Sequence, residues 1–208
     1  IHNWQGVDFF DRWLYQSNFP IVSARFISAT VLQFEQKRFL RSHFYNLDLY
    51  PPETNPFGYT WYIPVTCRFS NRTDRFQHTQ TFFIEKSIQN FTMTNASYQY
   101  FYCNTDFTGY FIMSYTDENW NELSNALDND NQELVEIDRA YLLTNAFLNA
   151  QTPNQSYLFV KQLTQFFYRG DYTGLVPWQA LSYHVHRMLD VVEYESLYEV
   201  VQVKRKVR

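Results

Sequence analysis

The chain has 208 residues, of which 45% are hydrophobic and 20% aromatic, enough for one large domain or two small ones with a sizeable core. Charged residues make up 18% and the formal net charge is −4, a balance that gives no sign of the basic face that nucleic-acid binding requires. No apolar run approaches the roughly 18 residues of a membrane-spanning helix, and no signal peptide opens the chain. We therefore expect no nucleic-acid partner and no membrane contact by this chain itself.

The first segment, residues 5–16, has the apolar spacing of an amphipathic helix. Its apolar face contains Val7, Phe10, Trp13 and Leu14. The sequence Asn18-Phe19-Pro20 ends this helix, because proline disfavours helical geometry in the residue before it. Since the chain begins within a helical pattern, we expect it to be a piece of a longer protein.

Short alternating segments then predict a series of strands with polar turns between them. They are Ile21–Ile27, Thr30–Gln36, Tyr59–Phe69, Thr79–Glu85 and Ser87–Thr92. Pro64 lies in the middle of the third segment and has no N–H to donate, so we expect that strand at a sheet edge or beside a bulge. Several short strands in succession predict an antiparallel sandwich.

The segment Tyr98–Tyr115 separates the predicted strands from the predicted helices. Two aromatic-rich runs, Tyr98–Cys103 and Tyr110–Tyr115, flank the polar residues 104–109, a pattern typical of a hairpin. Bulky residues stand on both faces of each run. We therefore expect this hairpin to be covered on one side by a second sheet and on the other by helices.

After Tyr115 the apolar period changes from two residues to 3.6, which predicts helices to the end of the chain. Asp117 is the expected N-cap of the first helix, and Pro177 fits the first turn of the fourth. Such helices with short loops pack as antiparallel hairpins. The predicted fold class is therefore α+β, an antiparallel β-sandwich followed by an array of helix hairpins.

The residues show no pattern of a catalytic or metal site. The chain has no H-E-x-x-H, G-x-S-x-G, C-x-x-C or glycine-rich phosphate loop. His184 and His186 are two residues apart on a predicted helix, so they point in different directions and cannot grip one metal ion. Acid pairs such as Asp128 and Asp130 fall in polar linkers, where solvated charge is the expected role.

Two cysteines and four glycosylation motifs provide information on the cellular compartment of the protein. Cys67 and Cys103 both fall on inward strand faces, either as two buried thiols or as a disulfide that joins the strands. The sequence N-x-[ST] occurs at Asn71, Asn90, Asn95 and Asn154. These sites suggest a lumenal or extracellular glycoprotein, with a cytoplasmic location as the alternative.

Six short motifs, in order from residue 13 to about residue 190, resemble those of zinc aminopeptidases of the aminopeptidase N and puromycin-sensitive type, the gluzincin family. The first three are Trp13–Val22 for W-x-x-Q-x-G-[FY]-P-[VL]-[VI], Gln36–Phe39 for Q-x-R-F, and Trp61–Thr66 for W-[YH]-[IV]-P-L-[TS]. The others are Tyr100–Leu123 for W-I-K-x-N-x-x-x-x-G-Y-[YF]-R-V-x-Y-x-x-x-x-W-x-x-L, Asp138–Phe147 for D-R-A-x-L-x-x-D-A-F, and Pro177–Ala180 for P-W-x-A. The chain departs from these motifs at Asn18 for glycine, Tyr100 for tryptophan and Ile112 for arginine.

The resemblance implies a domain division and a role. Residues 1–16 would end the catalytic domain, 17–115 would form a β-sandwich domain, and 116–208 would begin a C-terminal helical domain. The resembling family carries its zinc ligands and its G-x-M-E-N loop earlier in the chain, so no catalytic or cofactor residue is transferred to this one. The parent would be a membrane-anchored zinc aminopeptidase acting on peptides, with zinc in its catalytic domain.

Three functions remain open at this stage. The chain is a non-catalytic part that supports its own catalytic domain and begins the wall of the substrate chamber, an ectodomain module that binds a partner or a glycan, or a scaffold of an inactive paralogue. In the resembling family the helical domain continues further. The apolar stripes of Trp178–Val192 and Tyr194–Val201 therefore predict self-association of an isolated fragment.

Overall fold

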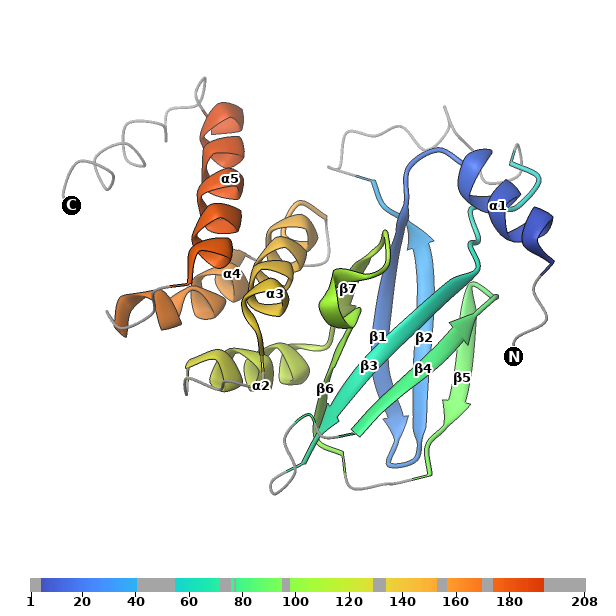
Figure 1. Cartoon of the computed structure of the whole chain (residues 1–208), viewed down its shortest axis with the longest axis horizontal. Coiled ribbons are helices and arrows are strands. Elements are labelled where there is room, and N and C mark those ends of the chain that lie inside the picture. The colour runs from blue at the N-terminus through green and yellow to red at the C-terminus, as the bar shows by residue number, and fades with distance from the viewer. Residues whose placement is uncertain are drawn as a thin grey trace.

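A computed structural model describes residues 5–40, 55–71, 76, 78–94, 98–128, 134–152, 157–169 and 174–192. Strands occupy one side of the molecule and the later helices the other (Figure 1). The elements in chain order are α1 (Gly6–Leu14), β1 (Pro20–Ser28), β2 (Val31–Arg38), β3 (Ile63–Ser70), β4 (His78–Ile84), β5 (Ile88–Thr92), β6 (Tyr100–Cys103), η3 (Thr105–Phe107), β7 (Ile112–Tyr115), α2 (Asp117–Asp128), α3 (Glu136–Asn149), α4 (Tyr157–Leu163), η4 (Gln165–Arg169) and α5 (Leu175–Val192). The predicted α+β class is confirmed.

The strands form two sheets, with the orders β5-β2-β1-β7 and β4-β3-β6. All pairs are antiparallel except β1 with β7, which run parallel from Ile21 opposite Ile112 to Ala24 opposite Tyr115. Aromatic rings from the two sheets meet in the space between them. Phe34 of one sheet lies 5.2 Å from Phe82 of the other, and Phe26 lies 5.3 Å from Phe101, measured between ring centroids.

Alternation of side chains explains why β3 forms where the sequence predicts it. Trp61, Ile63, Val65, Cys67 and Phe69 are all fully buried on the inward side. The strand is central in its sheet, which differs from the expectation based on Pro64. However, β6 pairs with β3 only from Cys67 onward, so Pro64 faces a strand partner on one side alone, at Phe83 of β4. A missing N–H is tolerated there.

The predicted hairpin within Tyr98–Tyr115 is wrong. β6 pairs with β3 in the three-stranded sheet, whereas β7 pairs with β1 in the four-stranded sheet. The polar residues between them therefore cross from one sheet to the other. The expected cover on both faces is present, since all four residues of β6 are buried and α2 and α3 contact β6 and β7. Burial of these two strands on both faces favours their placement in separate sheets over their pairing as a two-stranded hairpin.

The helices follow the predicted stripes with two adjustments. The Thr116 hydroxyl accepts the backbone N–H of Asn119, so Thr116, rather than the predicted Asp117, caps α2. The predicted third helix divides into α4 and the 3-10 turn η4. α5 begins at Leu175, with Pro177 in its first turn as predicted, and packs on α3. The stripe Tyr194–Val201 lies outside the described residues.

Within the described residues, no helix is long and apolar enough to cross a membrane.

Candidate functional site

Buried polar side chains gather where the sandwich meets α2 and α3. We call this region the sandwich–helix junction; it comprises residues 100–115, 119, 138, 141, 145 and 149. The free backbone of β6 is completed by α2. Asn119 Oδ1 accepts the N–H of Phe101 at 3.0 Å, and Asn119 Nδ2 donates to the Phe101 carbonyl at 2.9 Å. One side-chain amide thus takes the place of a neighbouring strand, which satisfies a buried edge.

Helix α3 completes β7 in the same way. The N–H of Met113 donates to Asn145 Oδ1 at 3.0 Å, and Asn149 Nδ2 donates to the Met113 carbonyl at 2.8 Å. Asn145 and Asn149 are four residues apart, so they lie on the same helical face. Both are buried, at 0% and 1% exposure. The edge of β7 is therefore held by a helix.

The crossing between the two sheets is fixed by Asn104, which adopts a left-handed conformation at φ 63°. Its amide accepts the N–H of Gly109 at 2.8 Å and donates to the Gly109 carbonyl at 2.9 Å. It also donates to the Tyr141 hydroxyl, which in turn donates to the Phe111 carbonyl. A Cβ at Gly109 would lie 2.1 Å from the Phe111 ring, so any larger residue must displace this buried ring.

Asp138 is the buried acid at the centre of the junction, with 0% exposure. Its Oδ1 accepts the Tyr102 hydroxyl at 2.8 Å and the backbone N–H of Asp106 at 3.1 Å. Its Oδ2 lies 4.0 Å from Nη1 of Arg68 and accepts no hydrogen bond. Burial raises the pKa of Asp138, although the Tyr102 and Asp106 hydrogen bonds oppose this effect. Burial and the Asp138 charge likewise raise the pKa of Tyr102 well above its ordinary value.

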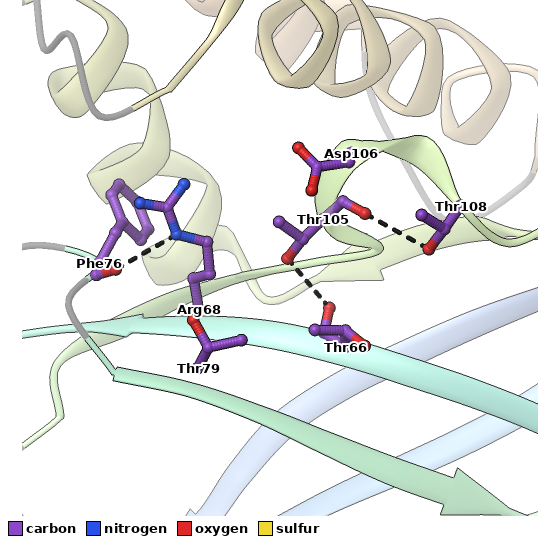
Figure 2. A pocket seen from close by; sticks show the side chains of 7 residues that line it. All are labelled: Thr66, Arg68, Phe76, Thr79, Thr105, Asp106 and Thr108. Carbon is purple, nitrogen blue, oxygen red and sulfur yellow. Dashed lines mark hydrogen bonds between the residues drawn. The ribbon is translucent and has the colours of Figure 1, made fainter.

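A polar pocket of about 550 Å³ opens beside this acid. Its lining residues are Thr66, Arg68, Phe76, Thr79, Thr105, Asp106 and Thr108 (Figure 2). Figure 2 shows the Arg68 side chain extending from β3, with its Nε bonded to the Phe76 carbonyl at 3.2 Å. Hydroxyl, cationic and anionic groups therefore surround one space that suits a polar ligand. Among the described residues that line it there is neither a cysteine nor a histidine.

The structure places the predicted site residues as follows. Cys67 and Cys103 face each other in register on β3 and β6, are fully buried, and form a disulfide. Asn90 is exposed on β5 and Asn71 follows β3, whereas Asn95 and Asn154 lie outside the described residues. His184 and His186 do not come together as ligands, because the former stacks on Phe147 in the interior and the latter is exposed.

The described segments contain no group of three or more histidine, cysteine or acidic side chains that could hold a metal ion. These residues therefore do not fit the zinc that the resemblance implies for the parent. The raised pKa of Asp138 is a property that catalytic acids share. Its complete burial and its commitment to Tyr102 and Asp106 make it a structural acid instead.

Local structure accommodates the three departures from the family motifs that were named above. Asn18 has φ 67°, a conformation that glycine adopts freely and asparagine tolerates, and its Nδ2 donates to the Phe39 carbonyl. Ile112 is buried in a small cluster with Phe39 and Leu148. The third, Tyr100, is buried and packs its ring edge against Phe76. These changes are thus accommodated by the fold.

Sequence reasoning missed the buried amides. Gln36, 3% exposed, accepts the N–H of Trp61 at 2.8 Å and donates to the Trp61 carbonyl at 2.9 Å, which links the two sheets. Asn119 acts in the same way on Phe101. The sequence signal for such an amide is a polar residue at a position where the period of the strand or helix predicts an apolar one. This signal does not reveal which group the amide binds.

No family model matches the chain. It is 32% identical to aminopeptidase Ey of Gallus gallus over 173 residues, which is 82% of this chain and 16% of that protein. It is 28% identical to aminopeptidase N of Homo sapiens over 145 residues, 67% of this chain and 13% of that protein. Glutamyl aminopeptidase of Homo sapiens is 27% identical over 200 residues, 92% of this chain and 19% of that protein.

The chain thus spans between 13% and 19% of the length of these curated relatives. The similarity covers both the sandwich and the helices of this chain. The chain belongs to the aminopeptidase N family, in which it corresponds to one part of much longer proteins.

Proposed function

We propose that the chain is a non-catalytic part of a zinc aminopeptidase that releases N-terminal residues from peptides. In this role it supports the catalytic domain and begins the wall of the chamber that holds the peptide. Residues 1–16 belong to the end of the catalytic domain, 17–115 to the sandwich domain and 116–208 to the helical domain. Zinc and the reacting groups are supplied by the rest of the parent protein.

The observation that carries this proposal is that residues of the family motifs make structural hydrogen bonds at the sandwich–helix junction. Asn104, Gly109 and Asp138, which match the family motifs, all hold the sandwich against the helices. Their polar atoms are taken up by hydrogen bonds within the protein, which supports a role in holding the junction rigid and not a role in catalysis. A rigid junction is what a support for a catalytic domain requires.

The experiment is to purify the chain alone and assay it with aminoacyl reporter substrates after chelator treatment and zinc exchange. We expect no hydrolysis and less than one zinc per chain by metal analysis. Stoichiometric zinc together with hydrolysis would overturn the proposal. The parent protein, assayed in parallel, provides the positive control for the reporters.

The outer face of α1 is the proposed contact with the catalytic domain. Val7, Phe10 and Leu14 are 74%, 60% and 71% exposed and stand on one side of the helix. The relatives are several times longer than this chain, so the parent has further protein to cover this face. In the parent, crosslinks from α1 should reach the segment that carries H-E-x-x-H; crosslinks confined to this chain would contradict the contact.

We infer a lumenal or extracellular location, on the outer side of a membrane that anchors the parent elsewhere in its sequence. The disulfide between Cys67 and Cys103 supports it, because disulfides form and persist in oxidising compartments. One relative, of Mus musculus, is named endoplasmic reticulum aminopeptidase 1. Thiol labelling of the natural protein should leave both cysteines unmodified before reduction. Labelling without reduction would contradict this location.

A binding module remains the second candidate function, and the pocket of Figure 2 favours it. The hydroxyl groups of Thr66, Thr79, Thr105 and Thr108 are the donors and acceptors that sugars engage. Binding of the chain to a panel of immobilised glycans tests this function. Retention that is lost in Thr79→Val and kept in Thr30→Val, an exposed threonine of the β1–β2 turn outside the pocket lining, would support it, and no retention would remove it.

The fragment is also proposed to self-associate through its C-terminal helices. Leu175 and Tyr183 of α5 are 64% and 60% exposed, and Trp178 is 38% exposed. A second copy is the proposed occupant of this face whenever the chain is separated from the rest of its parent. Light scattering at tens of micromolar should show a dimer for the wild type and a monomer for Leu175→Glu with Tyr183→Glu. A wild-type monomer would contradict the proposal.

A further inference from the structure

We propose that Asn90 carries an N-linked glycan that shields the outer strand of the four-stranded sheet. The motif Asn90-Phe91-Thr92 forms the end of β5, and the structure describes all three of its residues. Asn90 and Thr92 are exposed on one face of the strand, whereas Phe91 turns inward against Phe34 and Phe82. The acceptor amide and the hydroxyl of the motif therefore share the solvent side.

The contacts of Asn90 suit a modified amide. Gln33 lies opposite Asn90 in the β2–β5 register, and its Nε2 donates to Asn90 Oδ1 at 3.0 Å. Gln33 Oε1 in turn accepts two bonds from the guanidinium of Arg25, at 2.9 Å and 3.1 Å. This chain of bonds orients the Asn90 amide through its oxygen. The nitrogen Nδ2, to which a glycan is joined, is not used in these bonds.

The modification is a group transfer from a lipid-linked oligosaccharide. Asn90 Nδ2 loses a proton and forms a bond to C1 of the first sugar, and the C1–O bond to the polyprenyl diphosphate breaks. The amide oxygen remains, so the hydrogen bond from Gln33 survives the modification.

The position of β5 gives the glycan a consequence for the fold. β5 stands at the end of the order β5-β2-β1-β7, and its other side faces no described strand. An outer strand with free backbone groups invites pairing with another chain. A glycan is bulky and hydrophilic. Attached to the middle of β5, it hinders the approach of a second strand, and the polar groups of Arg25 and Gln33 beside it favour contact with sugar hydroxyls.

The inference rests on the proposed lumenal location, and the test separates the two. The full-length protein is produced through the secretory route of animal cells and treated with a glycosidase in heavy-oxygen water. Peptide mass spectrometry then reads each motif. We expect Asn90 to be converted to a labelled aspartate, with that label lost in Thr92→Val and kept in Thr92→Ser. Gln33→Ala, which leaves the motif intact, should keep the label.

An unlabelled Asn90 in this secreted protein would overturn the glycan at Asn90, whatever the natural location is. Protein taken from its natural source reports the location separately. If the secreted protein is labelled at Asn90 while the natural protein is cytosolic and unlabelled, the lumenal location is wrong and the glycan does not form in nature. If both are labelled, both proposals stand.

Discussion

The two ends of the sandwich attach their helices in contrasting ways. α1 and the turn that follows it are held by three side chains, since Arg12 and Gln16 donate to the Thr60 carbonyl and Trp13 donates to the Tyr62 carbonyl. α1 itself has no buried residue. At the other end α3 is buried over most of its length and exchanges hydrogen bonds with both β7 and the crossing residues.

This difference indicates different roles for the two attachments. The α1 contact positions a helix whose apolar face is left for another part of the protein. The sandwich–helix junction joins two layers into one cooperative unit, because its buried polar groups bond across the two layers, and losing one partner leaves the other unsatisfied away from water. Substitutions at the junction should therefore affect the whole chain, and those on the outer face of α1 should not.

The largest effect is expected at Asp138. Asp138→Ala removes the acceptor of the Asp106 N–H and leaves the Tyr102 hydroxyl with only its long contact to the Asn104 carbonyl, at 3.4 Å. Unpaired buried groups of this kind cost about 1–3 kcal/mol each, so the free energy of unfolding should fall by about 3 kcal/mol or more. Urea denaturation measures the loss. Asp138→Asn, which keeps an acceptor oxygen, is the matched control and should lose clearly less.

A second effect compares two glycines, one in each region. Gly109→Ala forces a methyl group against the buried Phe111 ring and should cost about 1–3 kcal/mol. Gly6→Ala adds the same methyl group in α1, where nothing lies within 4 Å of it. That change should be neutral or stabilise the chain slightly. Equal losses in thermal unfolding would show that the two regions do not differ as described.

The pH dependence of the junction follows from the raised pKa of Asp138. Between the ordinary carboxyl pKa and the raised one, the folded chain keeps a proton that the unfolded chain releases. The contribution of Asp138 to stability is therefore complete at low pH and declines as pH rises through that window, by about 1.4 kcal/mol per unit of displacement. Asp138→Asn should gain stability relative to the wild type as pH rises above the ordinary carboxyl pKa and through the raised one. An unchanged difference across this range would contradict the assignment.

The smallest effect is expected on the outer face of α1. Phe10→Ser should change the stability of this chain by less than about 0.5 kcal/mol, since Phe10 is 60% exposed. Trp13→Phe should cost about 1 kcal/mol, because it removes the hydrogen bond to Tyr62 while keeping an aromatic ring. Denaturant unfolding of both variants measures the two losses of stability. A larger loss for Phe10→Ser than for Trp13→Phe would show that α1 is not anchored through the face that carries Trp13.

Much of the fold follows from local pattern in the sequence. β3 is defined by the alternation from Trp61 to Phe69, and α5 by its 3.6-residue stripe. Strand pairing is different, because the separation of β6 from β7 depends on partners in β3 and β1 that lie far away in the chain. A hairpin and a crossing between sheets share the same turn residues.

The junction was only partly visible in the sequence. Resemblance to family motifs drew attention to Asn104, Gly109 and Asp138, but not to what they bind. Asn119 reads as an ordinary polar residue of a first helical turn, and its pairing with Phe101 emerges only when α2 packs against β6. Buried amides carry no periodic signal of their own, which is why these contacts required the structure.

Hydrogen exchange of the native chain tests the central claim most directly. The amides of Phe101, Gly109 and Met113 donate to side chains and not to a neighbouring strand. If the junction unites sandwich and helices, these amides should open with the same free energy as the slowest amides of β3, within about 1 kcal/mol. Opening several kcal/mol more easily, while β3 stays protected, would show that the helices detach from the sandwich and would contradict the account.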